Sequence, residues 1–144
     1  MDILTAMKIS GSALKAERSR LNITAMNMAN ANTTRTIEGG PYRAKSVIFA
    51  AKPLDKSFQD TLQSSHERLR KVEVTKVVED KTPFREVYDP SHPDADANGV
   101  VKLPNVNIVE QTVDMMNARR SYDANVTALT AAKGMALKAL EIGR

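Results

Sequence analysis

The sequence predicts a mainly α-helical fold with a small β element: long N- and C-terminal helices that pair as a coiled coil, and a middle region that contains a β-hairpin. Two long segments without proline, one at each end of the chain, predict the helices. Short runs of alternating apolar and polar residues between them predict the strands. The chain therefore divides into an N-terminal helix at 1–34, a linker and small β region with loops at 35–106, and a C-terminal helix at 107–144.

The N-terminal helix is predicted from Ile3 to Met28 because apolar residues recur there with a spacing of seven, at Met7, Leu14, Leu21 and Met28. The positions four residues further along complete the spacing of a coiled-coil seam, at Leu4, Gly11, Arg18 and Ala25. Three of these eight positions, Gly11, Arg18 and Ala25, are small or polar. The same stripe is also typical of an ordinary helix edge that faces a core within one chain.

The C-terminal helix is predicted to begin at Asn107, because Asn107 and Glu110 have the spacing of a capping box and Pro104 lies just upstream. Residues spaced by seven follow at Ile108, Met115, Tyr122, Leu129 and Ala136, with Thr112, Val126 and Leu140 at offset positions. At 1.5 Å per residue the two helices would be about 40 and about 50 Å long. We expect helices of such similar reach to pair antiparallel.

The middle of the chain is expected to form short strands, at Tyr42–Phe49, Lys71–Glu79, Phe84–Tyr88 and Val100–Leu103. Asn98-Gly99 predicts a tight turn before the last of these. Residues 52–70 are polar and are compatible with either a loop or a weak helix. The joint from Asn30 to Pro41 is expected to pass the chain from the first helix to a β element on a different axis.

The composition predicts a small core. Leu, Ile, Val and Phe supply 32 of 144 residues, tryptophan is absent, and only three tyrosines and three phenylalanines are present. Alanine is abundant along both helices, and each alanine buries little apolar area. We therefore expect the terminal helices to be loose in the monomer and to become ordered when several chains pack side by side.

Several functions are disfavoured by the sequence. The net charge of +4 is spread along the chain without a basic, aromatic-rich segment, so we expect no nucleic-acid binding. No stretch is apolar enough for membrane insertion, and Asp2 near the N-terminus argues against a secretory signal peptide. There is no cysteine, the two histidines lack ligand spacing, and no nucleophile or phosphate-loop motif occurs. We therefore expect no enzyme activity, no cofactor, no metal and no small-molecule substrate.

One motif suggests calcium. Residues 94–99, DADANG, match the first half of a calcium-binding loop. The twelfth position, which needs a bidentate glutamate, is Asn105, and prolines flank the loop. A turn-rich surface loop is therefore the preferred interpretation, with a calcium-responsive module as the alternative.

Two long segments resemble a known family. Ser10 to Thr36 resembles the N-terminal signature of the bacterial flagellar rod and hook proteins, and Gly39–Lys45 and Asp89–Asn125 resemble its proximal-rod members. A proline usual near Ile37 and an aromatic usual in Val100–Leu103 are missing, but neither departure touches the helical stripes. The residues that carry the family motif are Asn30, Thr33, Gly39, Gly40, Tyr42, Pro104 and Asn105.

The resemblance implies a non-catalytic subunit of the proximal rod of the flagellar basal body, the drive shaft that crosses the periplasm and transmits torque. It implies export from the cytoplasm by the flagellar type III export apparatus without a cleaved signal peptide. Residues 1–34 and 107–144 would form the rod core domain and pack into a tube with other rod proteins and copies of the chain. The alternative is a soluble helical adaptor or chaperone of a secretion system.

On the rod interpretation, the stripe residues pack between subunits; on the simpler interpretation, they form only a hairpin core within one chain. The candidate packing residues are Leu4, Met7, Leu14, Leu21, Met28, Met115, Tyr122, Val126, Leu129 and Leu140.

Overall fold

The computed structural model of the chain describes residues 3–54 and 69–143. In chain order the elements are helix α1 (Ile3–Ala29), strands β1 (Lys45–Pro53), β2 (Arg70–Glu79), β3 (Arg85–Tyr88) and β4 (Val100–Leu103), and helix α3 (Ile108–Ile142). The fold is mainly helical with a small β element, as the sequence predicts. The segment expected to be a loop or weak helix at 52–70 contributes its ends to β1 and β2, and its residues 55–68 lie outside the described residues.

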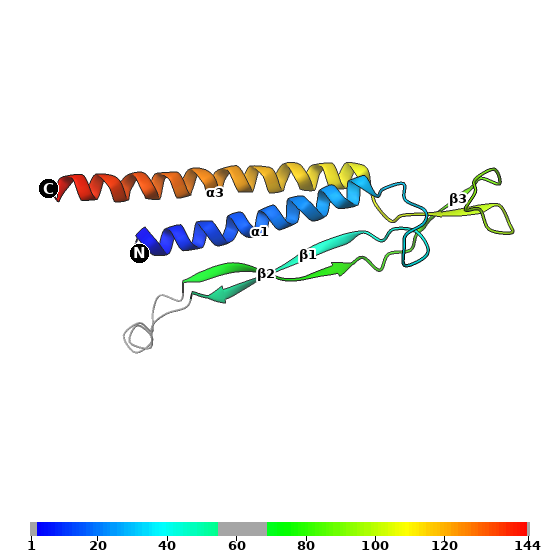
Figure 1. Cartoon of the computed structure of the whole chain (residues 1–144), viewed down its shortest axis with the longest axis horizontal. Helices are drawn as coiled ribbons and strands as arrows, with labels where there is room; N and C mark the ends of the chain where they lie inside the picture. The colour runs from blue at the N-terminus through cyan, green and yellow to red at the C-terminus, as the bar shows by residue number, and fades with distance from the viewer. Residues whose placement is uncertain (1–2, 55–68, 144) are drawn as a thin grey trace.

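The helices and the first hairpin form three layers (Figure 1). α1 is the middle layer, because it contacts α3 on one side and both β1 and β2 on the other. α1 and α3 run antiparallel, so both termini lie at one end of an elongated molecule and the β3–β4 hairpin lies at the other. With 35 residues against 27, α3 extends past the N-terminal end of α1.

The β1–β2 hairpin folds back along α1, so the expectation of a β element on a different axis is wrong for this hairpin. Small side chains on α1 allow the close approach: the Ser12 hydroxyl accepts a hydrogen bond from the Val72 N–H at 3.1 Å and donates one to the Ile9 carbonyl at 2.7 Å. Ala16 is buried nearby. The strands are antiparallel, with Lys45 opposite Glu79 and a bulge between Ile48 and Phe49.

β1 begins at Lys45 rather than at Tyr42. The residues before Lys45 use their N–H groups elsewhere: Tyr42 donates to the Thr33 carbonyl at 3.0 Å, and Ala44 donates to Asn105 Oδ1 at 2.8 Å. These two N–H groups are therefore bonded outside the β1–β2 ladder.

The second hairpin pairs β3 with β4, with Arg85 opposite Leu103 and Tyr88 opposite Val100. The turn predicted at Asn98-Gly99 is present. Gly99 has a φ of +76° and donates its N–H to the Asp96 carbonyl at 2.9 Å. A side chain at this position would meet Pro90 and Tyr88, which is a further reason for glycine.

The core of the described chain is small, in agreement with the composition. Its buried apolar residues are Ala16, Ala31, Tyr42, Ala44, Val101, Ala118 and Ala132. The largest side chain that is fully buried is polar, that of Asn27. Because alanine side chains bury little area, this core supplies limited hydrophobic stabilisation.

Candidate assembly surface

A buried hydrogen-bond network, which we call the clasp, joins α1, the joint, β1 and α3 through Asn27, Tyr42, Lys45 and Gln111. The Asn27 side chain is 2% exposed. Its Nδ2 donates to the Lys45 carbonyl at 2.7 Å and to Gln111 Oε1 at 2.9 Å. Its Oδ1 accepts from the Tyr42 hydroxyl and from the Lys45 N–H, each at 2.9 Å. An amide has two donor hydrogens and two acceptor lone pairs, so Asn27 is fully satisfied within one chain.

The Tyr42 hydroxyl takes part in the clasp as a neutral donor. Burial raises the pKa of Tyr42 above its ordinary value of 10.0, and the negative charge of Glu79 raises it further. Both causes disfavour the phenolate, which could not donate to Asn27. The clasp is therefore intact at neutral pH.

The joint that follows α1 is shaped by residues of the family motif. Asn30 Nδ2 donates to the Met26 carbonyl at 2.9 Å, and Asn30 Oδ1 accepts from the Thr33 hydroxyl at 3.2 Å. Gly39 and Gly40 have φ values of +92° and +77°, which residues with a side chain rarely adopt. Between them these residues end the helix and reverse the chain toward Tyr42.

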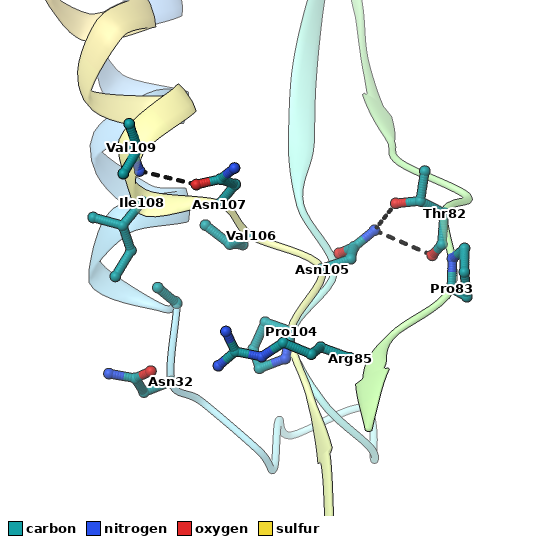
Figure 2. Close-up of a pocket in the computed structure, with 11 residues that line it drawn as sticks. Asn32, Thr82, Pro83, Arg85, Pro104, Asn105, Val106, Asn107, Ile108 and Val109 are labelled. Carbon is teal, nitrogen blue, oxygen red and sulfur yellow. Dashed lines mark hydrogen bonds between the residues drawn. The ribbon is translucent and has the colours of Figure 1, made fainter. Parts of the chain in front are cut away.

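Pro104 and Asn105 hold the β4–α3 connection against the same joint. Pro104 is buried. Asn105 Nδ2 donates to the Thr82 hydroxyl at 2.8 Å, as Figure 2 shows, while its Oδ1 accepts from the Ala44 N–H. The motif residues scattered from Asn30 to Asn105 in the sequence therefore come together at the end of the molecule away from the termini.

α3 starts at this same place. Asn107 is its N-cap, as predicted, and Asn107 Oδ1 accepts from the Val109 N–H at 3.1 Å, one residue earlier than the capping box requires.

Sequence reasoning missed Asn27 and Gln111, the two clasp residues that lie on the helices. A signal was present: Asn27 lies between Met26 and Met28, two residues before the Ala-Asn-x-x-Thr motif that begins at Ala29. A polar residue within an apolar helix end often makes a buried hydrogen bond.

The helix pair uses a face of α3 that was only partly predicted. Ala118 and Ala132 are buried on α3, whose only packing partner among the described elements is α1. Arg20 on α1 and Asp114 on α3 form an ion pair at 3.2 Å. Seven of the predicted stripe residues on the two helices are half-buried, namely Met7, Leu14, Leu21 and Met28 on α1 and Met115, Tyr122 and Leu129 on α3.

Three predicted packing residues lie outside this helix contact. Leu4 is 65% exposed, Leu140 is 71% exposed, and Val126 is also exposed. The companion positions Gly11, Arg18 and Ala25 are exposed as well, so the second half of the predicted seam on α1 faces away from α3. α1 packs on α3 and on the β1–β2 hairpin, and these exposed α1 positions belong to neither contact. Their role in packing between subunits stays a prediction.

α3 leaves apolar side chains uncovered in two places. Val109, Val113 and Met116 form what we call the outer face, at the start of α3; Val109 is 71% and Met116 is 61% exposed. The part of α3 that extends past α1, Lys133–Ile142, is called the overhang; it exposes Met135, Leu137, Leu140 and Ile142. Exposed apolar groups in such number on one helix are typical of a protein–protein contact surface.

The candidate calcium loop uses its acidic side chains within the chain. Asp94 accepts from the Thr34 hydroxyl at 2.7 Å, and Asp96 accepts from the N–H groups of Asn98 and Val100. In residues 3–54 and 69–143, no group of three or more acidic, histidine or cysteine side chains could hold a metal ion. Hydrogen bonds from Ser91 lower the pKa of nearby Asp89. The geometry is that of a loop stabilised by its own turns.

Neither of the two described helices combines the length and the apolar character that a membrane span requires.

Comparison with known proteins identifies the family. The family model described as "Flagella basal body rod protein" matches residues 7–35, and that described as "Flagellar basal body rod FlgEFG protein C-terminal" matches residues 97–142. These two segments contain most of α1 and all of α3, so the similarity to flagellar rod proteins covers both long helices.

Relatives match over the full length. The chain is 43% identical to the flagellar basal-body rod protein FlgC of Bacillus subtilis (strain 168) and 41% identical to that of Salmonella typhimurium, with 100% of each chain covered in both cases. It is 37% identical to FlgC of Borreliella burgdorferi, over 99% of this chain and 98% of the relative. The chain belongs to the FlgC family of flagellar basal-body rod proteins.

Proposed function

We propose that the chain is a structural subunit of the proximal rod, which assembles through its terminal helices into a tubular drive shaft and transmits torque. The observation that carries this proposal is the contrast on α3 between a satisfied inner side and an uncovered outer side. Ala118 is fully buried against α1, whereas Val109 and Met116 on the outer face are exposed. Neighbouring subunits in the rod would cover these groups.

The clasp gives the proposed function a mechanical basis. Asn27 bonds to both β1 and α3, so a load applied to one helix passes to the other helix and to the hairpin. The hydrogen bonds centre on the buried Asn27 side chain and are 2.7–2.9 Å long, and satisfied networks of this kind make a structure more rigid. A subunit built in this way would move as one body when its neighbours push on it.

The proposed role includes a route and partners. We infer that the chain assembles in the periplasm with other rod proteins and with copies of itself, after export by the flagellar export apparatus. The small core supports export in an unfolded state, because a core made mostly of alanine costs little free energy to open. No catalytic step is needed for this role.

The test changes the outer face without touching the helix contact. Met116→Asp places a charge at an exposed apolar site, and Asn117→Asp places the same charge on the adjacent residue, which is also exposed. In cells that lack the native chain, we expect Met116→Asp to abolish rod assembly and motility, since the charge would be buried between subunits. Asn117→Asp should restore both.

Circular dichroism and thermal melting of the two purified variants serve as the control. Equal spectra and melting temperatures, together with failed assembly of Met116→Asp alone, support the rod role. Normal assembly by Met116→Asp would refute a buried outer face. Unfolding of the Met116→Asp monomer would instead assign this residue to a core within one chain, and Val113→Asp then provides a second outer-face variant for the same comparison.

The adaptor or chaperone alternative predicts a chain that acts while soluble. Full-length similarity to rod proteins favours the rod, and no feature of the described residues favours the adaptor.

A further inference from the structure

One side of α1 is covered neither by α3 nor by the β1–β2 hairpin. Its exposed residues recur every three or four positions, which places them together along the helix, at Leu4, Lys8, Gly11, Lys15, Arg18 and Asn22. We call these residues the basic stripe, because Lys8, Lys15 and Arg18 are cationic and none of the others is acidic. None of the three cations forms an ion pair with another described residue.

The acidic groups closest to the basic stripe already have partners within the chain. Glu17 is the only acidic residue of α1, and its carboxylate lies 4.0 Å from the Arg20 guanidinium with the side chain 16% exposed. Glu73 on β2 lines the same shallow surface as Lys15, but its carboxylate pairs with the Lys52 ammonium at 3.0 Å. The basic stripe therefore presents positive charge to an outside partner.

The β3–β4 hairpin carries the opposite charge. Residues 86–102, which we call the acidic tip, contain one basic residue, Lys102, and four acidic residues, Glu86, Asp89, Asp94 and Asp96. Tyr88 is 73% exposed and lies on the same side of β3 as Glu86, since side chains alternate along a strand. An exposed aromatic ring beside a carboxylate suits a lysine or arginine side chain, because the face of the ring attracts cations.

The acidic tip and the basic stripe do not meet within one chain. Among the described elements, β3 and β4 contact only each other, and they project from the end of the molecule away from the termini (Figure 1). The basic stripe begins near the N-terminus, at the opposite end. A contact between them therefore joins two molecules through two different surfaces. Such a contact continues from subunit to subunit, into a ring or a helical array.

We propose that the basic stripe of α1 receives the acidic tip of a neighbouring rod subunit, a second copy of this chain. Charge complementarity selects this occupant, because the tip opposes the stripe in sign while two stripes or two tips repel each other. Glu86 and Tyr88 are exposed on the tip and supply a carboxylate and an aromatic ring for the cations. This inference rests on the proposed function, because it assigns one of the contacts between rod subunits.

The first experiment locates the contact with the full chain, which has no native cysteine. Gly11→Cys places a thiol on the basic stripe, where an added side chain meets open space, and Ala97→Cys places one on the exposed acidic tip. The two purified chains, one of them with an affinity tag, are mixed and oxidised, and the mixed disulfide dimer is measured. The control replaces the Gly11→Cys chain by Ala124→Cys, an exposed site of α3.

We expect at least about fivefold more mixed dimer with Gly11→Cys than with Ala124→Cys, because the opposite charges bring the tip to the stripe. Equal yields overturn the proposal. The Met116 and Asn117 comparison above does not depend on this contact. Equal yields therefore count against the contact of the tip with the stripe and not against the rod role.

The second experiment reverses charges in the same cross-linking assay. Glu86 is the acidic residue to change, because the carboxylates of Asp89 and Asp96 accept the hydrogen bonds that shape the turns. Glu86→Lys in the tip chain, or Arg18→Glu in the stripe chain, should lower the yield by at least about threefold. Both changes together should restore it, because the reversed charges attract again.

Two exposed charge reversals outside both surfaces serve as matched controls, Asp123→Lys for the tip chain and Lys76→Glu for the stripe chain. Each changes the net charge by the same amount as its counterpart and should leave the yield unchanged. Controls that lower the yield as much as the test changes would show that net charge alone drives the encounter, and this result overturns the assigned contact. So does a doubly reversed pair that fails to regain the native yield.

Discussion

The clasp and the outer face of α3 lie at the same end of the molecule and differ in how complete they are. Asn27 makes every hydrogen bond that its side chain allows, and it does so within one chain. Val109 and Met116 are large and apolar, and remain mostly exposed. Polar contacts thus fix the shape of the subunit, while apolar surface is left for partners.

The same difference explains how a chain with so small a core holds a defined shape. A hydrogen-bond network specifies one arrangement of its partners, because any other arrangement leaves buried polar groups unpaired. The exposed apolar residues on α3 are therefore not needed to specify this arrangement. They remain available for contacts between subunits, where a large apolar area stabilises the assembly.

Among the substitutions that test this difference, Asn27→Ala should have the largest effect on stability. This change leaves the Gln111 amide, the Tyr42 hydroxyl and the Lys45 backbone without their buried partner. We expect a loss of about 3 kcal/mol in the free energy of unfolding, measured by urea denaturation, because buried polar groups without partners are costly. Asn22→Ala, an exposed position on the same helix, should change stability by less than about 0.5 kcal/mol. Equal effects of the two changes would show that the clasp does not stabilise the folded chain.

Ala118→Leu tests whether α1 and α3 are as close as the buried alanines require. Ala118 is 0% exposed, so a larger side chain there must push the helices apart. The expected cost is about 2 kcal/mol in the free energy of unfolding. Ala124→Leu makes the same substitution at an exposed site of α3 and should be close to neutral. A neutral Ala118→Leu would mean that the helices are not tightly packed.

Tyr42→Phe tests a single hydrogen bond of the clasp, since it removes only the hydroxyl that donates to Asn27. The expected cost at neutral pH is about 1 kcal/mol, for one hydrogen bond. The pH dependence is more specific. Because the pKa of Tyr42 is raised in the folded chain, the unfolded chain loses its phenol proton first as pH rises above 10.0, and stability falls there.

The measurement is the urea midpoint of the native chain and of Tyr42→Phe from pH 8 to above the ordinary tyrosine pKa. Tyr42→Phe should lose less stability than the native chain over the alkaline part of this range. Identical alkaline slopes would show that Tyr42 ionises as easily in the folded chain as in the unfolded one.

The smallest effect is expected for the ion pair between the helices. Arg20 and Asp114 are both partly exposed, and solvent screens pairs of this kind. Arg20→Met keeps the apolar part of the side chain and should cost about 0.5 kcal/mol at low salt, with less difference at high salt. If Arg20→Met lost as much stability as Asn27→Ala, this ion pair and not the clasp would be the main polar contact that stabilises the helix pair.

The sequence predicts the elements well because their signals are local. Periodicity places both helices, Asn107 marks the start of α3, and Asn98-Gly99 marks the turn before β4. The family resemblance leads to the motif residues at the joint, and the structure shows that Tyr42 donates a hydrogen bond to Asn27 and that Asn105 accepts one from Ala44.

Features that depend on three-dimensional neighbours were not predicted. Periodicity cannot show that α1 has two packing partners, so Leu4 and Arg18 were placed on a seam that the structure turns outward. It cannot show that Asn27 is buried either, because an asparagine on a helix is usually exposed. The hairpin lies along α1 because Ser12 and Ala16 are small, which matters only once β2 is close.

Hydrogen exchange of the dilute monomer tests the central claim, that the clasp is complete in one chain while the overhang of α3 awaits a neighbour. We predict slow exchange for the Lys45 N–H, which donates to Asn27, and fast exchange for amides of the overhang, which frays without lateral support. The overhang amides should become protected in assembled rods. Overhang amides as protected in the monomer as the Lys45 N–H would contradict the claim.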